Sequence, residues 1–178
     1  MGAFSNGGDY FEGDLEREIE PKISIATAFS YNSSANRSGG SIGKELFEFR
    51  DIRSLFVDAL FKYRGWSLAA EYAFRNTLRG TSPVTFSVFD TSQKSPSLVY
   101  QGSGYNLDAS YVFVNQNTVV FRYSHLEPES IIRNYQKPTT YLGLGLGRYL
   151  KGHRLKWQGE LGQTITSTGT NSQKNSWI

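Results

Sequence analysis

Apolar and polar side chains alternate along several segments of this chain, each about nine to twelve residues long. In the clearest segment, residues 154–161, leucine, tryptophan and glycine alternate with charged or amide side chains. Residues 66–75 repeat the arrangement, with aromatic and aliphatic side chains on one side. Because successive side chains of a β-strand point to opposite faces, each segment predicts a strand with one apolar and one polar face.

Across the whole chain this pattern predicts seven strands and the start of an eighth, joined by links that are alternately long and short. The expected strands cover approximately residues 23–32, 53–63, 66–75, 105–114, 118–125, 139–150 and 153–166, and the eighth starts at Trp177. Long polar links are expected at about 33–52, 76–104, 126–138 and 167–176, and tight turns at Arg64-Gly65, Asn115-Gln116 and Lys151-Gly152. Residues 1–22 are expected to be an acidic linker or periplasmic turn ahead of the strand region at 23–178.

The alternation of link lengths favours a transmembrane β-barrel, in which tight turns gather at one end and long loops at the other. Tyr63, Trp66, Phe113 and Tyr149 lie beside the short turns, where interfacial aromatic residues are typical. In residues 141–147 leucines alternate with glycines, which leaves room in a lumen for a loop or a neighbouring side chain. Alternation by itself is equally compatible with a soluble β-barrel or sandwich that has its apolar face inside, so that reading stays open.

Composition removes several other classes of protein. The chain has 178 residues, of which 38% are hydrophobic. A mean hydropathy of −0.43 and the absence of any run of 18 apolar residues exclude a bundle of membrane helices. The net charge is only +3 and basic residues are interspersed with acidic ones, which argues against nucleic-acid binding.

The sequence shows no pattern typical of a catalytic or metal site. His125 and His153 stand alone near strand ends, and the chain has no cysteine. The acidic run at 9–20 lacks the spacing of a calcium loop and is expected to be a solvated linker. We therefore expect no enzyme activity, no cofactor and no metal.

A series of short motifs runs through most of the chain in a fixed order. They are Gly8-Asp9-Tyr10-Phe11, Asp14-Leu15-Glu16-Arg17-Glu18, Pro21-Lys22-Ile23-Ser24-Ile25, Ser41-Ile42-Gly43-Lys44-Glu45-Leu46, Arg50-Asp51-Ile52, Asp58-Ala59-Leu60-Phe61-Lys62-Tyr63-Arg64-Gly65-Trp66, Ala70-Glu71-Tyr72, Gly102-Ser103-Gly104-Tyr105-Asn106, Gly147-Arg148-Tyr149-Leu150-Lys151-Gly152-His153 and Leu155-Lys156. In these pieces the chain resembles the C-terminal part of the phosphate-selective porin O and P family, in the form common in Bacteroidetes-type bacteria. The resemblance implies a sixteen-stranded barrel in the outer membrane of a Gram-negative bacterium, often trimeric, that passes phosphate or other small anions.

The chain departs from that family at both ends. The family's N-terminal half is absent, and so is a terminal strand ending in an aromatic residue. Residues 1–6 also lack the basic and apolar stretches of a signal peptide. We therefore expect a fragment: an antiparallel transmembrane β-barrel segment of about seven to eight strands.

If the charged face lines a lumen, ten charged side chains are candidates for pore-lining positions. The basic ones are Lys62, Arg64, Arg75, Arg122, Arg154 and Lys156, and the acidic ones are Asp58, Glu71, Asp108 and Glu160. Rings of Arg and Lys in a narrow pore attract anions, although nearby carboxylates neutralise part of that charge. Solvated or mutually paired wall charges are the simpler interpretation of any one of these residues.

Three functions follow from these patterns. The first is an outer-membrane channel for passive diffusion of small anions such as phosphate, whose partners are outer-membrane lipid and the solute. The second is a soluble β-barrel that binds a small ligand in an apolar interior. The third is a non-conducting outer-membrane barrel that anchors a surface assembly.

Overall fold

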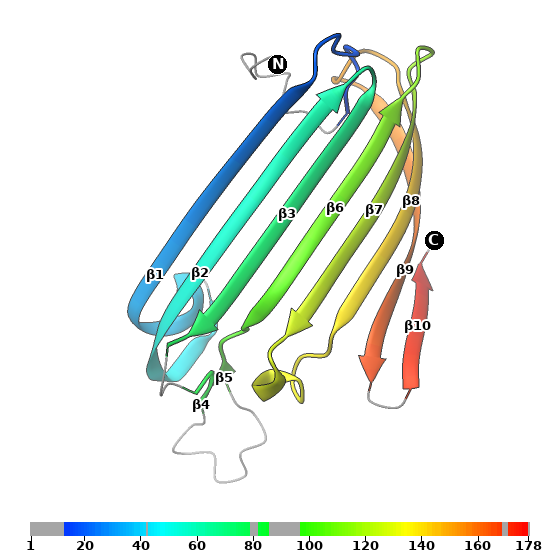
Figure 1. Cartoon of the computed structure of the whole chain (residues 1–178). Helices are drawn as coiled ribbons and strands as arrows, with labels where there is room; N and C mark the ends of the chain where they lie inside the picture. Colours follow the sequence, from blue (N-terminus) through cyan, green and yellow to red (C-terminus); the bar gives the residue numbers. More distant parts are fainter. Residues whose placement is uncertain (1–12, 42, 79–81, 86–96, 169–170, 178) are drawn as a thin grey trace.

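The computed structural model describes residues 13–41, 43–78, 82–85, 97–168 and 171–177. Ten strands are present there: β1 (Lys22–Ser41), β2 (Glu45–Tyr63), β3 (Trp66–Thr77), β4 (Val84–Thr85), β5 (Ser97–Leu98), β6 (Gly102–Val112), β7 (Asn117–Pro128), β8 (Thr139–Tyr149), β9 (Lys156–Thr168) and β10 (Asn171–Trp177). Eight of them form one antiparallel sheet in the order β1-β2-β3-β6-β7-β8-β9-β10 (Figure 1). The expectation of an all-β, antiparallel architecture is confirmed.

The sheet is open within the described residues, because β1 and β10 are edge strands that do not pair with each other. A 3₁₀ turn at Ser130–Ile132 follows β7. In the part of the chain that the structure covers, no helix is long and apolar enough to cross a membrane.

Alternation along the strands produces two faces because the cross-strand register keeps like positions opposite each other. One row runs through Ile23, Phe61, Leu68, Ala109, Phe121, Leu144 and Leu161 on seven successive strands. A second row runs through Ala26, Asp58, Glu71, Asn106, Ser124, Tyr141 and Thr164. A slip by one residue would exchange these sets, so the register preserves one apolar and one polar face.

The three connections that the sequence predicts to be short, β2–β3, β6–β7 and β8–β9, lie at one end of the sheet, called the short-turn end here, at the top in Figure 1. Link lengths are not sorted fully by end, because at the other end β1 ends at Ser41 with β2 beginning at Glu45, and β9 ends at Thr168 with β10 beginning at Asn171. Arg64 and Gly65 both have positive φ, 49° and 93°, as expected for a two-residue hairpin turn. Gln116 has a φ of 66° in the turn between β6 and β7. The third connection is longer than the expected Lys151-Gly152 turn, since β8 ends at Tyr149 and β9 begins at Lys156.

Two segments expected as long links are strands instead. Residues 33–52 belong largely to β1 and β2, which continue past the other strands as a hairpin with register shifts between Asn32 and Ala35 and again before Arg37. Residues 171–177 form β10, paired with β9 from Asn171↔Thr168 to Trp177↔Gly162. Both segments are polar, and backbone pairing in a hairpin does not require apolar side chains.

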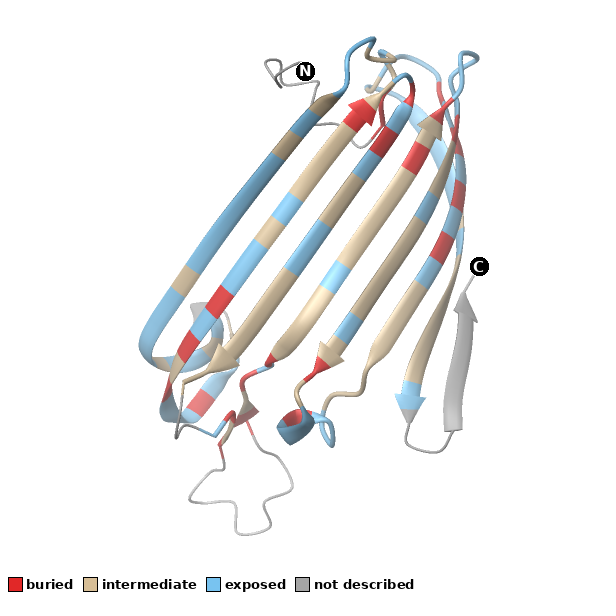
Figure 2. Cartoon of the chain, viewed as in Figure 1, coloured by how far each residue is buried: buried red, intermediate tan, exposed pale blue. Residues whose placement is uncertain are grey.

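The expected link at 76–104 contains a small second sheet. Val84 and Thr85 pair with Leu98 and Ser97, and residues 86–96 between them lie outside the described part. Leu46, Ile52 and Val99 form a buried cluster beside it. Along the middle of the strands, by contrast, most residues are intermediate or exposed (Figure 2).

Candidate functional site

The face of the sheet that carries the row from Ile23 to Leu161, called the apolar face here, is exposed although its side chains are large. Leu144 is 58% exposed and Leu161 62%, and Phe121 and Leu68 are also exposed. Adjacent rows add Ile25, Phe29, Leu142 and Leu146. A surface of exposed aliphatic and aromatic side chains that spans the sheet is far larger than the scattered apolar residues of a soluble surface.

Aromatic side chains lie on the apolar face near the short-turn end. The rings of Trp66 and Tyr111 are 4.9 Å apart, and Phe113 meets Tyr111 edge-on at 4.8 Å. Tyr149, expected among them, instead lies on the opposite face and is buried there against His153. Its position follows from the register, which aligns Tyr149 with Lys156 rather than with Trp157.

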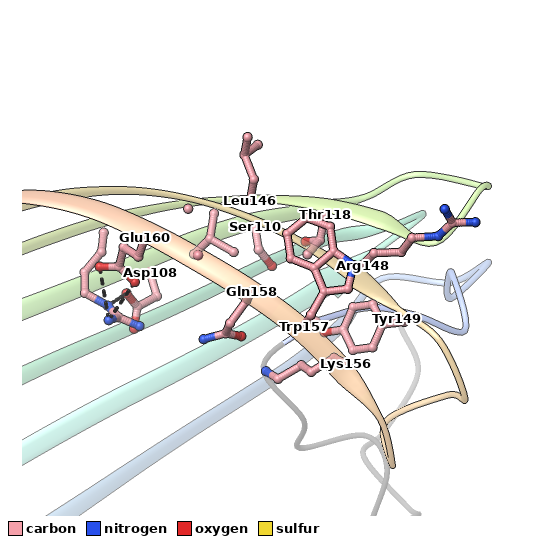
Figure 3. A pocket seen from close by; sticks show the side chains of 15 residues that line it. Asp108, Ser110, Thr118, Leu146, Arg148, Tyr149, Lys156, Trp157, Gln158 and Glu160 are labelled. Carbon is pink, nitrogen blue, oxygen red and sulfur yellow. Dashed lines mark hydrogen bonds and ion pairs between the residues drawn. The ribbon is translucent and has the colours of Figure 1, made fainter. Parts of the chain in front are cut away.

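The opposite face, called the polar face here, carries a connected network of charged and hydroxyl groups in the middle of the sheet. Arg122 Nε donates to Asp108 Oδ1 at 2.7 Å, and Arg122 Nη1 lies 3.2 Å from Glu160 Oε2. Tyr141 Oη donates to Glu160 Oε1 at 2.6 Å. Figure 3 shows Asp108 and Glu160 converging on the same guanidinium group.

The network extends along the row next to it. Asn106 Nδ2 donates to Asp108 Oδ2 at 3.2 Å, and Ser124 Oγ donates to Asn106 Oδ1 at 2.6 Å. The chain of contacts therefore crosses four strands, β6 to β9, and holds two carboxylates around one guanidinium. Asn106, Ser124 and Tyr141 were not among the candidates from the sequence, although their positions in the alternation place them on this face.

Glycines on β8 make room for this network. A Cβ at Gly143 would lie 2.5 Å from Glu160 Oε1 and 2.9 Å from a ring carbon of Tyr141. The Tyr141 ring itself covers Gly162 on β9. The expectation that the glycine row admits neighbouring side chains is confirmed, and an aromatic ring laid over a strand glycine shields backbone that would otherwise be bare.

The other candidate residues have different surroundings. Asp58 and Glu71 are exposed and directly opposite each other on β2 and β3. Arg75 Nε donates to Ser54 Oγ at 3.0 Å near the long-link end. Lys62 is buried, with Nζ 3.5 Å from the carbonyl oxygen of Gly13.

The remaining three candidates lie at the short-turn end. Arg64 is in the β2–β3 turn, with its guanidinium 5.1 Å from the centre of the Tyr63 ring. Arg154 is exposed in the connection before β9. Lys156 lies at the start of β9, with Nζ 6.0 Å from the centre of the Tyr149 ring. Neither Arg64 nor Arg154 is on a strand, so only eight of the ten candidates lie on the sheet face itself.

Charge on this face is balanced rather than basic. The basic side chains Lys22, Lys62, Arg75, Arg122 and Lys156 share this face with the acidic Asp58, Glu71, Asp108 and Glu160. Lys22 is paired with Glu18, ahead of β1, at 2.6 Å. Arg122 is shared between two carboxylates, which reduces its capacity to attract a free anion. Among the described residues there is also no group of three or more His, Cys, Asp or Glu side chains placed to hold a metal ion.

These features define an open antiparallel sheet with an exposed apolar face and an opposite face that carries charged and hydroxyl groups. The chain matches no family model, no curated protein and no solved structure.

Proposed function

We propose that this chain forms part of the wall of a β-barrel channel in a bacterial outer membrane. The apolar face would contact lipid, and the polar face would line a water-filled lumen through which small solutes diffuse passively. The observation that supports this proposal most strongly is the exposed apolar face spanning seven strands.

The height of the apolar face is close to that of the lipid-facing apolar band of outer-membrane barrels. On β3 it extends from Trp66 to Phe74. Those eight residue steps correspond to about 26 Å along the strand, or roughly 20 Å after a barrel-like tilt of about 40°. The apolar band of outer-membrane barrels is about 25 Å tall.

A soluble ligand-binding barrel would curl the sheet toward the apolar face and bury it. Here the contacts across non-adjacent strands are on the other face, where Arg122 on β7 reaches Glu160 on β9. Gly13, ahead of β1, also lies against the polar face, with its carbonyl oxygen 3.5 Å from Lys62 Nζ. Both observations favour curvature around the polar side.

In lipid, the exposed edges of β1 and β10 require backbone partners, because an unpaired edge leaves N–H and C=O groups without hydrogen bonds. The barrel would therefore be completed by further strands of a longer protein or by other copies of the chain. A homotrimer of complete barrels is the assembly that the porin resemblance suggests.

Small anions such as phosphate are the solutes suggested by the same resemblance. The balanced charge of the polar face favours a pore of weak charge selectivity over one that selects anions strongly. The reversal potential across a chloride salt gradient in planar bilayers distinguishes a weakly selective pore from an anion-selective one. Strong anion selectivity would move the reversal potential toward the equilibrium potential of chloride.

A non-conducting anchor for a surface assembly is a second candidate. It is favoured by the part of β1 and β2 that extends past the other strands and packs against the β4–β5 segment. The β1–β2 extension packs Leu46 and Ile52 against Val99. Arg50, also buried, donates from Nε to the Ser82 carbonyl oxygen at 2.5 Å. A packed extension of this kind suits a binding partner as well as a channel mouth.

The chain contains no cysteine, so single-cysteine variants test the membrane orientation directly. A fluorophore at Leu144→Cys should be quenched by lipids carrying a quencher in the acyl chain, and one at Gln158→Cys by a water-soluble quencher. Equal aqueous quenching at both positions in vesicles would contradict the proposal. Conductance steps in planar bilayers then distinguish a channel from an anchor.

A further inference from the structure

Residues 13–18, called the strap here, lie ahead of β1 at the short-turn end of the sheet. Gly13 and Asp14 are buried, and Gly13 borders the hollow over the polar face that Figure 3 shows from close by. The hollow is also lined by Ser110, Thr118, Gln158 and Lys156. The first residues of the strap therefore lie over the polar face, and the strap does not extend away from the sheet as a solvated linker would.

Asp14 is the main anchor of the strap. Its side chain is 2% exposed, and Oδ2 accepts a hydrogen bond from Gly65 N–H at 2.6 Å. Both carboxylate oxygens lie 3.1 Å from the backbone nitrogen of Glu18, which closes the strap into a turn. The carboxylate thus joins the strap to the β2–β3 connection.

Arg17 and Glu18 make the second set of attachments. Arg17 donates from Nη1 to the Val112 carbonyl oxygen at the end of β6, and its guanidinium lies 5.6 Å from the centre of the Tyr111 ring. The carbonyl oxygen of Glu18 accepts from the Arg64 N–H at 2.9 Å. Two hairpins that are separate in sequence are therefore tied together by one short segment.

The wall beneath the strap differs in exposure from the wall beyond it. Lys62, Ser67 and Ser110 are buried, at 2%, 3% and 8% exposure. Asp58 and Glu71, further along the same strands and on the same face, are exposed. Solvent thus reaches the middle of the polar face but not the part of β2, β3 and β6 nearest the short turns.

We propose that the strap is an inward-folded constriction: it covers the polar face at the short-turn end and narrows the aqueous path there. That the strap narrows an aqueous path rests on the proposed channel function, whereas its covering of the polar face does not. Asp14 and Arg17 are the residues that hold the strap in place, and Lys62 lies directly under it.

Cysteine labelling tests the cover without requiring conduction. In the otherwise unchanged full chain, Ser110→Cys should react slowly with a small hydrophilic thiol reagent, and Ser124→Cys, in the middle of the polar face, should react fast. Adding Asp14→Ala leaves two backbone N–H groups without an acceptor, so we expect labelling at Ser110→Cys to accelerate roughly tenfold. Glu16→Ala, an exposed neighbour in the strap, is the matched control and should leave the rate unchanged. Unchanged labelling of Ser124→Cys in the Asp14→Ala background shows that the wall is still folded.

Conductance tests the narrowing. Asp14→Ala and Arg17→Gln should each raise single-channel conductance in planar bilayers, and Glu16→Ala should not. If labelling at Ser110→Cys does not respond to Asp14→Ala, the strap is not the cover and the proposal is wrong. Faster labelling with unchanged conductance overturns the constriction. If no variant conducts, the channel function fails, and the labelling rates still decide whether the strap covers the wall.

Discussion

Arg122 on β7 and Glu160 on β9 form an ion pair across the intervening strand, with Nη1 3.2 Å from Oε2. The two strands are not neighbours, so the side chains meet above β8. Gly143 makes this possible, since it is opposite Arg122 in the register and has no side chain to separate the pair. The ion pair that crosses β8 at this position explains why residue 143 is a glycine.

A side chain at Gly143 should break this arrangement. In Gly143→Val the new Cβ would lie 2.5 Å from Glu160 Oε1 and 2.9 Å from the Tyr141 ring, so both must move. We expect the free energy of unfolding to fall by about 1–3 kcal/mol, as for other overpacked sites. Equilibrium unfolding in urea, followed by the loss of β-structure in detergent micelles, measures the change.

Gly159→Val is the matched control for that substitution. Gly159 is on the apolar face of β9, and a Cβ there meets nothing within 4 Å. Valine favours strands more than glycine does, so this variant should be as stable as the parent or slightly more stable. Equal losses of stability in both variants would contradict the role assigned to the Gly143 gap.

The Arg122 bridge also predicts the direction of selectivity changes. Arg122→Gln leaves Asp108 and Glu160 without their shared cation, so the pore should become more cation-selective. Glu160→Gln removes one carboxylate and should shift the reversal potential toward anions. Arg154→Gln, in the exposed connection before β9, should have little effect. Shifts of the same sign in both bridge variants would rule out this face as the lining of the pore.

The stability cost of losing the bridge should be small. The side chains of Arg122 and Asp108 are 37% and 31% exposed, and partly solvated ion pairs contribute about 1 kcal/mol or less. If Arg122→Gln lowers the free energy of unfolding by much more than that value, the main role of the ion pair is to stabilise the fold and not to set the charge of the polar face. Unfolding in urea, as for Gly143→Val, supplies the measurement.

Alternation predicted the strands whose two faces differ in chemistry. β3, β6, β7 and β8 were located to within a few residues because their apolar and polar positions alternate regularly. β10 was missed because residues 171–177 are polar on both sides until Trp177, and backbone pairing in a hairpin does not require apolar side chains. The β1–β2 extension was read as a loop for the same reason, since its Asn, Ser and Gly residues resemble a link.

The candidate site was predictable only as a set of positions on one face. Alternation places Asp108, Arg122 and Glu160 on the polar side, but it does not show that they touch, because contact depends on register and on the empty space at Gly143. The strap was missed entirely. Its anchoring carboxylate, Asp14, belongs to an acidic run in which Glu16 and Glu20 are exposed, and no local pattern distinguishes the buried carboxylate from them.

Charge placed on the apolar face should prevent insertion into a bilayer. Leu144 is near the middle of the apolar row and is 58% exposed, so Leu144→Arg would put a guanidinium into the hydrocarbon region. A cost of about 2–4 kcal/mol is typical for Arg near the bilayer midplane. Gln158→Arg, on the polar face of the adjacent strand, should insert normally. The protease-protected fraction in vesicles reports insertion, and equal insertion of the two variants would favour a soluble barrel.

Stability at the short-turn end should depend on pH through His153, in the connection between β8 and β9. Burial, and then the nearby charge of Lys62, lower the pKa of His153 below its usual value of 6.5, with Lys156 acting in the same direction and Glu16 opposing. The unfolded chain therefore binds the proton more tightly than the folded one, and protonation favours unfolding. The histidine's effect is absent above about pH 6.5, and stability should fall as the pH drops from there through the lower pKa of the folded state. His153→Gln should flatten this part of the curve in urea unfolding measured between about pH 5 and pH 8, whereas His125→Gln, on β7, should retain it. A parent protein that gains stability on acidification through this window would show that His153 is charged in the folded state.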